Sequence, residues 1–276
     1  MLQADRELLR LLPNVKRARD FHLYLENGKR LVDLWLSGGR AVLGHKPTGV
    51  LRALKNAAER GLFTPLPHPM EKRFFKTLAA FFPERSFRLY MDEGSLFRAM
   101  AEAGFDSCYD PAFPHSKGEG KQNLSLWRPF LTPNEYTDTP VLLPVLPLLP
   151  WPLPPVVLVL EKRMEASFPP SELIPPLLLA TATRSLYDLI AELKKPARRY
   201  PKIEKALGAQ KSYWQRRGIY LTVTPKMDKE IYTSLFRRFL DGGFLIPPSS
   251  GEPTILPASM SQGEESALAA LLAAQL

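Results

Sequence analysis

The chain has 276 residues, of which 45% are hydrophobic and 24% charged, and its formal net charge is +9. This length suits one large domain or a large and a small one, and the composition is ordinary for a globular protein. No apolar run reaches the roughly 18 residues that a membrane-spanning helix needs. We therefore expect no membrane-spanning segment.

The ends and the cysteine content indicate a cytoplasmic protein. The N-terminal residues 1–6 lack the apolar core of a signal peptide. Cys108 is the one cysteine, which excludes an intrachain disulfide. The four histidines show no metal-ligand spacing, so we expect no metal site. The positive net charge is compatible with an anionic partner, but a solvated basic surface is the more ordinary explanation.

The N-terminal quarter contains strong turn and helix signals. Asn27-Gly28 between two apolar runs predicts a β-hairpin. Proline at the start and glycine after the end are typical of helix boundaries. These signals predict helices over residues 3–12, ending before Pro13, over residues 48–60, ending at Gly61, and from Pro69 onward.

The middle of the chain has the pattern of an α/β protein. Residues 87–91 predict a strand, the turn at Gly94 follows it, and residues 96–103 predict a helix. Three later apolar runs are continuous, as in buried parallel strands. They cover residues 141–143, 156–160 and 177–182.

The C-terminal part predicts a compact α/β subdomain. Residues 217–224 predict a strand, Asp228 caps a helix, and residues 244–246 predict a second strand. Ser261 and Glu264 have the spacing of a capping box at the start of the last helix. The core faces of the two helices are expected to carry Ile231, Leu235 and Phe239, and Leu268, Leu271 and Leu272.

Several of these pieces, in this order, resemble the class III aminotransferases of pyridoxal-phosphate (PLP) fold type I, and the glutamate-1-semialdehyde aminomutases within that group. Residues 24–33 followed by Leu-Gly-His-Lys-Pro at 43–47 are similar to the family's N-terminal segment. Residues 90–95 stand where the family carries Asn-Ser-Gly-Ser/Thr-Glu-Ala. Residues 218–221 and 243–249 resemble its small domain.

The resemblance implies a catalytic lysine, and this chain lacks it at the expected place. The family's lysine ends a strand of the form Pro-Asp-x-x-x-x-Ala/Gly-Lys. The best counterpart begins at Pro176 and places Thr183 at the lysine position, with Arg184 beside it. Threonine cannot form an imine, and no lysine lies between Lys162 and Lys194. The arginine that binds the substrate carboxylate in the family is not evident either.

The other family positions indicate a vestigial cofactor site formed by Gly94, Ser95 and Glu161. Gly94 and Ser95 suit an anion site at a helix N-terminus, but Asp92 and Glu93 bring negative charge to it. The two carboxylates are expected to stabilise the helix start themselves. Glu161 follows an apolar strand, where the family has an acid for the pyridinium nitrogen.

A basic segment at residues 194–217 contains nine Lys and Arg residues interleaved with Tyr200, Tyr213 and Trp214. Such a pattern can bind nucleic acid, but no RNA-binding motif accompanies it. A solvated helical face is the favoured interpretation, so we expect no nucleic-acid partner.

The sequence thus predicts an α/β protein with a reduced large domain of PLP-transferase type, containing a central mostly parallel sheet, and a small α/β C-terminal domain. Residues 1–45 are expected to contribute to the small domain, residues 46–200 to form the large domain, and residues 201–276 to complete the small one. The leading hypothesis is a catalytically degenerate aminotransferase-like homodimer with a binding or assembly role and no cofactor. The alternatives are an enzyme that binds PLP or another anionic small molecule noncovalently at the Gly94–Ser95 turn, and a nucleic-acid-associated protein.

Overall fold

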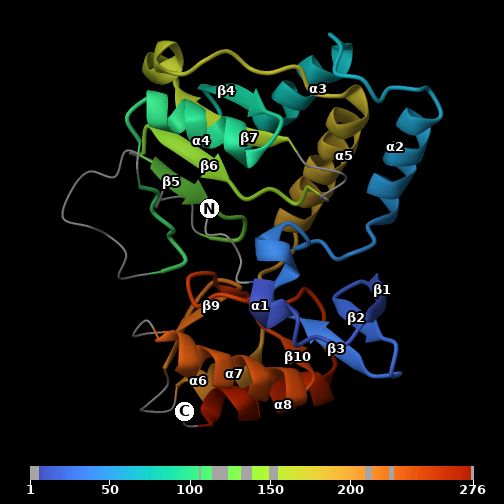
Figure 1. Ribbon diagram of the computed structural model, residues 1–276, viewed down its shortest axis with the longest axis vertical. Helices are drawn as coiled ribbons and strands as arrows, with labels where there is room; N and C mark the ends of the chain where they lie inside the picture. Colours follow the sequence, from blue (N-terminus) through green and yellow to red (C-terminus); the bar gives the residue numbers. More distant parts are fainter. Residues whose placement is uncertain are drawn as a thin grey trace. The chain divides into compact units, whose positions relative to one another are not determined.

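The computed structural model describes residues 6–105, 107–113, 124–131, 139–148, 155–208, 213–223 and 227–274 (Figure 1). The chain divides into two compact units. Unit 1 consists of Met1–Lys46 and Pro196–Leu276, and unit 2 consists of Pro47–Lys195. No helix in the described ranges is long and apolar enough to cross a membrane.

Unit 2 is built around a four-stranded sheet (Figure 1). Its strands, in spatial order, are β4 (Arg85–Tyr90), β7 (Val156–Glu161), β6 (Val141–Pro144) and β5 (Leu124–Trp127). β7 is antiparallel to both of its neighbours, and only β5 and β6 run parallel. The α/β class is confirmed, but the expectation of a mostly parallel sheet is wrong for these strands.

Helices cover both faces of this sheet. They are α2 (Thr48–Ala58), α3 (Pro69–Leu78), α4 (Glu93–Glu102) and α5 (Pro176–Leu193). On one face, Val157 joins a core that includes Phe74 of α3 and Leu186 of α5. On the other face, the next residue, Leu158, joins a core that includes Leu96 of α4. Helix α2 packs against α5.

This two-sided burial explains why the direction of the strands was mispredicted. Residues of β7 alternate between two apolar cores, so every position must be hydrophobic whichever way its neighbours run. A continuous apolar run reports burial on both faces, and parallel direction is only the commonest cause of that burial. The sequence pattern therefore predicted the burial of β7 correctly and its direction relative to its neighbours incorrectly.

The apolar run at residues 177–182 was predicted as a buried strand, but it forms part of a helix. Residues Pro176–Leu193 make up α5, with Pro176 in the first helical turn. Short apolar runs do not distinguish a buried strand from a buried helix. Proline in the first turn was the signal for the helix, since its missing N–H would have no helical partner there.

Both edges of the unit 2 sheet are occupied by other segments of the chain. Along β4, Glu172 donates its backbone N–H to the carbonyl of Leu89, at 2.8 Å. The Leu89 amide donates to the Ser171 hydroxyl at 3.1 Å. Along β5, Tyr109 exchanges backbone hydrogen bonds with Leu124 and Leu126. The outer backbone groups of Leu89 on β4, and of Leu124 and Leu126 on β5, thus have partners within the chain.

Unit 1 contains two small sheets (Figure 1). The first is mixed and contains β1 (Val15–Arg19), β2 (His22–Leu25), β3 (Arg30–Asp33) and β10 (Phe244–Leu245). The predicted hairpin joins β2 to β3, and Gly28 has a φ of 80°, a left-handed conformation that suits glycine. The parallel pairing of β3 with β10 joins the two ends of the chain in one unit.

The second sheet differs from its prediction. It contains β11 (Thr254–Ile255), β9 (Tyr220–Val223) and β8 (Trp214–Arg217). One continuous strand was expected over residues 217–224, but the chain turns at Gly218 and forms an antiparallel hairpin. Thr224 lies outside the described residues, as do residues 3–5 of the predicted N-terminal helix. That helix is described as α1 (Arg6–Leu9).

The helices of unit 1 begin at the predicted caps. Asp228 accepts a hydrogen bond from the amide of Ile231 and starts α7 (Lys229–Asp241). On this helix Leu235 and Phe239 are buried, as predicted, whereas Ile231 is 46% exposed and does not join the core. Helix α6 (Pro201–Leu207) packs against α8 (Gln262–Ala273). On α8, Leu268 and Leu272 are buried, and Leu271 only partly so.

The capping box of α8 also ties this helix to the first sheet. Glu264 accepts from the Ser261 amide at 2.8 Å and from Arg30 at 2.7 Å, and lies 2.9 Å from His22. Burial raises the pKa of Glu264, but the hydrogen bonds from Ser261 and His22 outweigh it. The pKa therefore lies below its ordinary value of 4.5.

This depressed pKa predicts a pH dependence of stability. A carboxyl with a lowered folded-state pKa stabilises the fold above its unfolded-state pKa, and the contribution disappears as pH falls through the folded value. We expect Glu264→Gln to flatten the loss of stability below about pH 4.5. Thermal unfolding between pH 3 and 7 measures this loss of stability. Glu230→Gln, at an exposed position on α7, is the control. A wild-type slope in Glu264→Gln would contradict the assignment.

Candidate functional site

The Gly94–Ser95 turn starts helix α4, and the chain's own carboxylates surround it. Asp92 is the N-cap, and its Oδ1 accepts from the Ser95 amide at 2.8 Å. Glu93 lies in the first turn. The carboxylate of Glu172 accepts from the amide of Met91 at 2.7 Å. A carboxylate oxygen thus occupies the position at the helix N-terminus that a bound phosphate would need.

Glu161 lies at the other end of the sheet. In the antiparallel pairing of β4 and β7, Tyr90 faces Val156 and Arg85 faces Glu161. The Gly94 turn follows Tyr90, so Glu161 is five residue steps away, about 17 Å along the strand. Its carboxylate pairs with Arg163. The structure brings Gly94 and Ser95 together, but it does not bring Glu161 to them.

Thr183 lies inside a helix, where a strand end was expected. It is buried in the middle of α5, and its hydroxyl donates to the carbonyl of Leu179 at 2.7 Å. Such a bond uses the hydroxyl hydrogen of a threonine within the helix itself. Thr183 is therefore not the strand-end residue that the family pattern requires, whereas the absence of lysine from residues 163–193 does not depend on that exact alignment.

These placements do not fit PLP at the expected site. The turn that should bind the phosphate is closed by Asp92. The acid expected near the pyridinium nitrogen lies at the opposite end of its strand. No group of three or more His, Cys, Asp or Glu residues in the described ranges is arranged to hold a metal ion.

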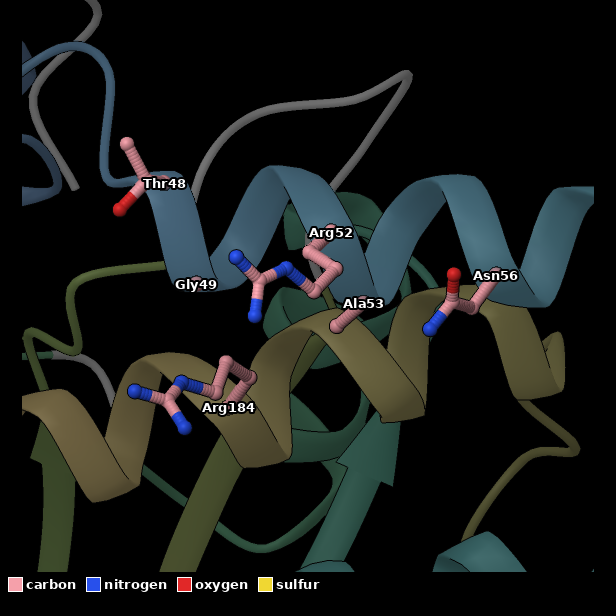
Figure 2. Close-up of a pocket in the computed structure, with 6 residues that line it drawn as sticks. All are labelled: Thr48, Gly49, Arg52, Ala53, Asn56 and Arg184. Atoms are coloured by element: carbon pink, nitrogen blue, oxygen red, sulfur yellow. The ribbon is translucent and has the colours of Figure 1, made fainter.

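A different site lies where α2 packs against α5, and sequence reasoning did not predict it. A pocket of about 340 Å³ opens there, and Figure 2 shows the residues that line it. Its lining residues are Thr48, Gly49, Arg52, Ala53 and Asn56 of α2 and Arg184 of α5. In Figure 2 both arginine side chains extend toward the N-terminal end of α2.

Gly49 allows the close approach of Arg184 to the first turn of α2. A Cβ atom added at Gly49 would lie 2.6 Å from Nε of Arg184 and 3.0 Å from its Cζ and Nη2. The guanidinium therefore packs against the glycine backbone, and any side chain at this position would displace it. A glycine in the first turn of a helix was the one sequence signal for this contact.

The charge of the pocket is strongly positive. None of its lining residues is acidic. Arg184 forms an ion pair with Asp188 at 2.6 Å, one helical turn along α5. Arg52 is exposed, and within the described ranges its side chain makes no hydrogen bond or ion pair. Pro47 precedes α2, and no side chain caps the helix.

The basic segment of the sequence is partly neutralised within unit 1. Lys202 donates from its side chain to Gln262 and Ser266 of α8. Arg216 pairs with Glu204 at 2.7 Å, and its guanidinium lies 5.2 Å from the ring centre of Tyr200. These contacts use the cations to hold α6, α8 and β8, which favours the structural interpretation over nucleic-acid binding.

Comparison with known proteins identifies the fold. The structure is similar to ornithine aminotransferase from Plasmodium yoelii, with a TM-score of 0.67 and 12% identity over 94% of this chain and 92% of that one. It is also similar to acetylornithine aminotransferase from Elizabethkingia anophelis, with a TM-score of 0.65 and 11% identity over 99% and 98%. The chain therefore has the fold of the PLP-dependent class III aminotransferases.

The sequence comparisons add a relative but no function. An uncharacterized protein of Treponema pallidum (strain Nichols) is 26% identical over an alignment that covers 91% of each chain. No known family model matches the chain.

Proposed function

We propose that this protein is a catalytically degenerate relative of the aminotransferases, with no PLP Schiff-base chemistry and a role in binding or assembly. One observation carries the proposal: the helix N-terminus expected to hold the cofactor phosphate is capped by Asp92, the chain's own carboxylate. Two like charges about 4 Å apart repel by roughly 1–4 kcal/mol, depending on solvation. PLP would have to displace this carboxylate or bind against it.

One further point supports the same proposal. The sequence has no lysine between Lys162 and Lys194, the stretch in which the resemblance placed the imine-forming residue. Without a lysine in position, a fold of this type cannot hold PLP covalently. We propose a homodimer, because members of the family that the sequence resembles form their active site between two subunits.

Borohydride trapping tests the loss of Schiff-base chemistry. The purified full chain is incubated with PLP near stoichiometric concentration, reduced with borohydride and mapped by peptide mass spectrometry. We expect only weak modification spread over exposed lysines, because no lysine is positioned to form a stable imine. An active aminotransferase treated identically is the positive control, and light scattering of the same sample measures the oligomeric state.

A single lysine modified to completion would overturn the proposal. The result would be decisive if an amino-group donor also released the adduct before reduction, since that is the behaviour of a catalytic imine.

A further inference from the structure

The pocket between α2 and α5 concentrates positive charge in a way that the fold does not require. Arg52 and Arg184 reach it from different helices, and no acidic residue lines it. The amino end of a helix such as α2 also carries roughly half a positive charge. Cations are favourable at helix C-termini and unfavourable at N-termini, so the position of Arg184 against Gly49 works against the helix dipole.

Three other helix starts follow the opposite rule, whereas α5 shares the pattern of α2, with a proline before it and no acid in its first turn. α4, α7 and α8 begin with the side-chain caps Asp92, Asp228 and Ser261, and each has an acid in its first turn. α2 has neither a side-chain cap nor an acid in its first turn. Asp188 compensates Arg184 only in part, and a local arrangement whose cost to stability is not fully compensated is typical of a functional site.

We propose that this pocket binds a small phosphate-bearing molecule, with its phosphate between the guanidinium groups of Arg52 and Arg184. A guanidinium presents several N–H donors in a plane and matches the oxygens of phosphate. The Thr48 hydroxyl and the Asn56 amide, which line the same pocket, supply further polar contacts. The bound anion would neutralise Arg52 and the helix end, and would share Arg184 with Asp188.

The dimensions and charge of the pocket restrict the ligand class. A volume of about 340 Å³ lies at the lower end of the range for small-molecule sites and suits a small ligand. Arg184 already pairs with Asp188, so the ligand must bridge the two guanidinium groups, and the three free oxygens and nearly two negative charges of a phosphate monoester suit this better than a carboxylate. Inorganic phosphate and a phosphate monoester share this chemistry, so both are tested.

Calorimetric titration of the full chain with inorganic phosphate, at constant ionic strength, measures the affinity and stoichiometry of binding. PLP serves as the phosphate monoester, and pyridoxal, which lacks the phosphate, is its control. We expect saturable one-to-one binding of phosphate or PLP and none of pyridoxal. Arg52→Gln and Arg184→Gln should each weaken binding about ten- to a hundredfold, because each removes charge-assisted hydrogen bonds.

Two matched variants separate a built site from general positive charge. Arg60→Gln removes the same charge from an exposed residue just beyond α2 and should leave the affinity unchanged. Gly49→Ala keeps both arginines but displaces Arg184, so it should weaken binding by a similar factor to Arg184→Gln. Circular dichroism confirms that each variant is folded.

Three results would overturn the proposal: no saturable phosphate binding by the wild type, equal losses in Arg60→Gln and Arg52→Gln, or wild-type affinity in Gly49→Ala. None of them affects the borohydride result, and a trapped lysine would leave the phosphate titration intact. The two proposals therefore fail independently.

Discussion

Replacing Asp110 by alanine is expected to lower the free energy of unfolding by about 3–5 kcal/mol. Asp110 accepts two hydrogen bonds from the guanidinium of Arg128, at 2.8 Å and 2.6 Å, and one from the amide of Ala112. Arg128 is only 4% exposed. Without this carboxylate the positive charge stays buried, which costs far more than an exposed ion pair contributes.

Urea titration measures this loss, and hydrogen exchange assigns it to unit 2. Glu102→Ala, an exposed acid at the end of α4, is the control and should change stability by no more than about 0.5 kcal/mol. The double variant Asp110→Ala with Arg128→Met should recover much of the loss, because no buried charge is then uncompensated. If Asp110→Ala behaves like Glu102→Ala, the buried pair does not contribute as we describe.

Asp33→Ala is expected to destabilise unit 1 by about 3 kcal/mol, because it leaves buried donors without acceptors. Asp33 is 2% exposed. Its Oδ1 accepts from the amides of Trp35 and Leu36, at 2.8 Å and 2.9 Å, and its Oδ2 lies 2.8 Å from Nε2 of His45. The same carboxylate holds a turn in which Leu36 and Ser37 have positive φ values, an unfavourable conformation for residues other than glycine.

The conservative variant Asp33→Asn separates these contributions. Its amide oxygen can still accept from the two backbone amides, so the loss should be smaller than that of Asp33→Ala. Asp241→Ala, at the exposed end of α7, controls for the removal of a negative charge. Thermal and urea unfolding give the ranking, and equal losses in Asp33→Asn and Asp33→Ala would show that the backbone amides do not depend on this side chain.

Local signals predicted most helix and turn boundaries. The hairpin at Gly28, the start of α3 at Pro69, the Asp228 cap and the capping box of Ser261 with Glu264 are all present. Each depends on a few neighbouring residues whose backbone geometry or hydrogen bonding is fixed by residue type. Such interactions can be inferred without knowledge of distant contacts.

Features that depend on distant contacts were predicted less well. The direction of β7 is set by which strands lie beside it, and its apolar pattern is the same for either direction. The apolar run at residues 177–182 was predicted as a strand but is part of α5. Its burial can be inferred from its apolar residues, but six residues are too few to show the periodicity of a helix. Gly218 interrupts the predicted strand near its beginning by forming a turn, so Arg217 ends β8 and β9 begins at Tyr220.

The candidate site shows the same limit. The arginine pocket joins residues 48–56 to Arg184, which are more than a hundred positions apart, and only the packing of α2 on α5 brings them together. Conversely, Gly94 and Glu161 were grouped by a family pattern that assumes parallel strands. The antiparallel β7 separates them.

The covered edges of the unit 2 sheet restrict how this protein can associate with others. A free edge strand can recruit a strand from another chain, as in strand-addition complexes and in fibrils. Here Leu89 of β4 already bonds to Ser171 and Glu172, and Leu124 and Leu126 of β5 already bond to Tyr109. A strand from another chain would have to displace these segments, so we expect partners of unit 2 to be selected by side-chain complementarity more than by their ability to extend the sheet.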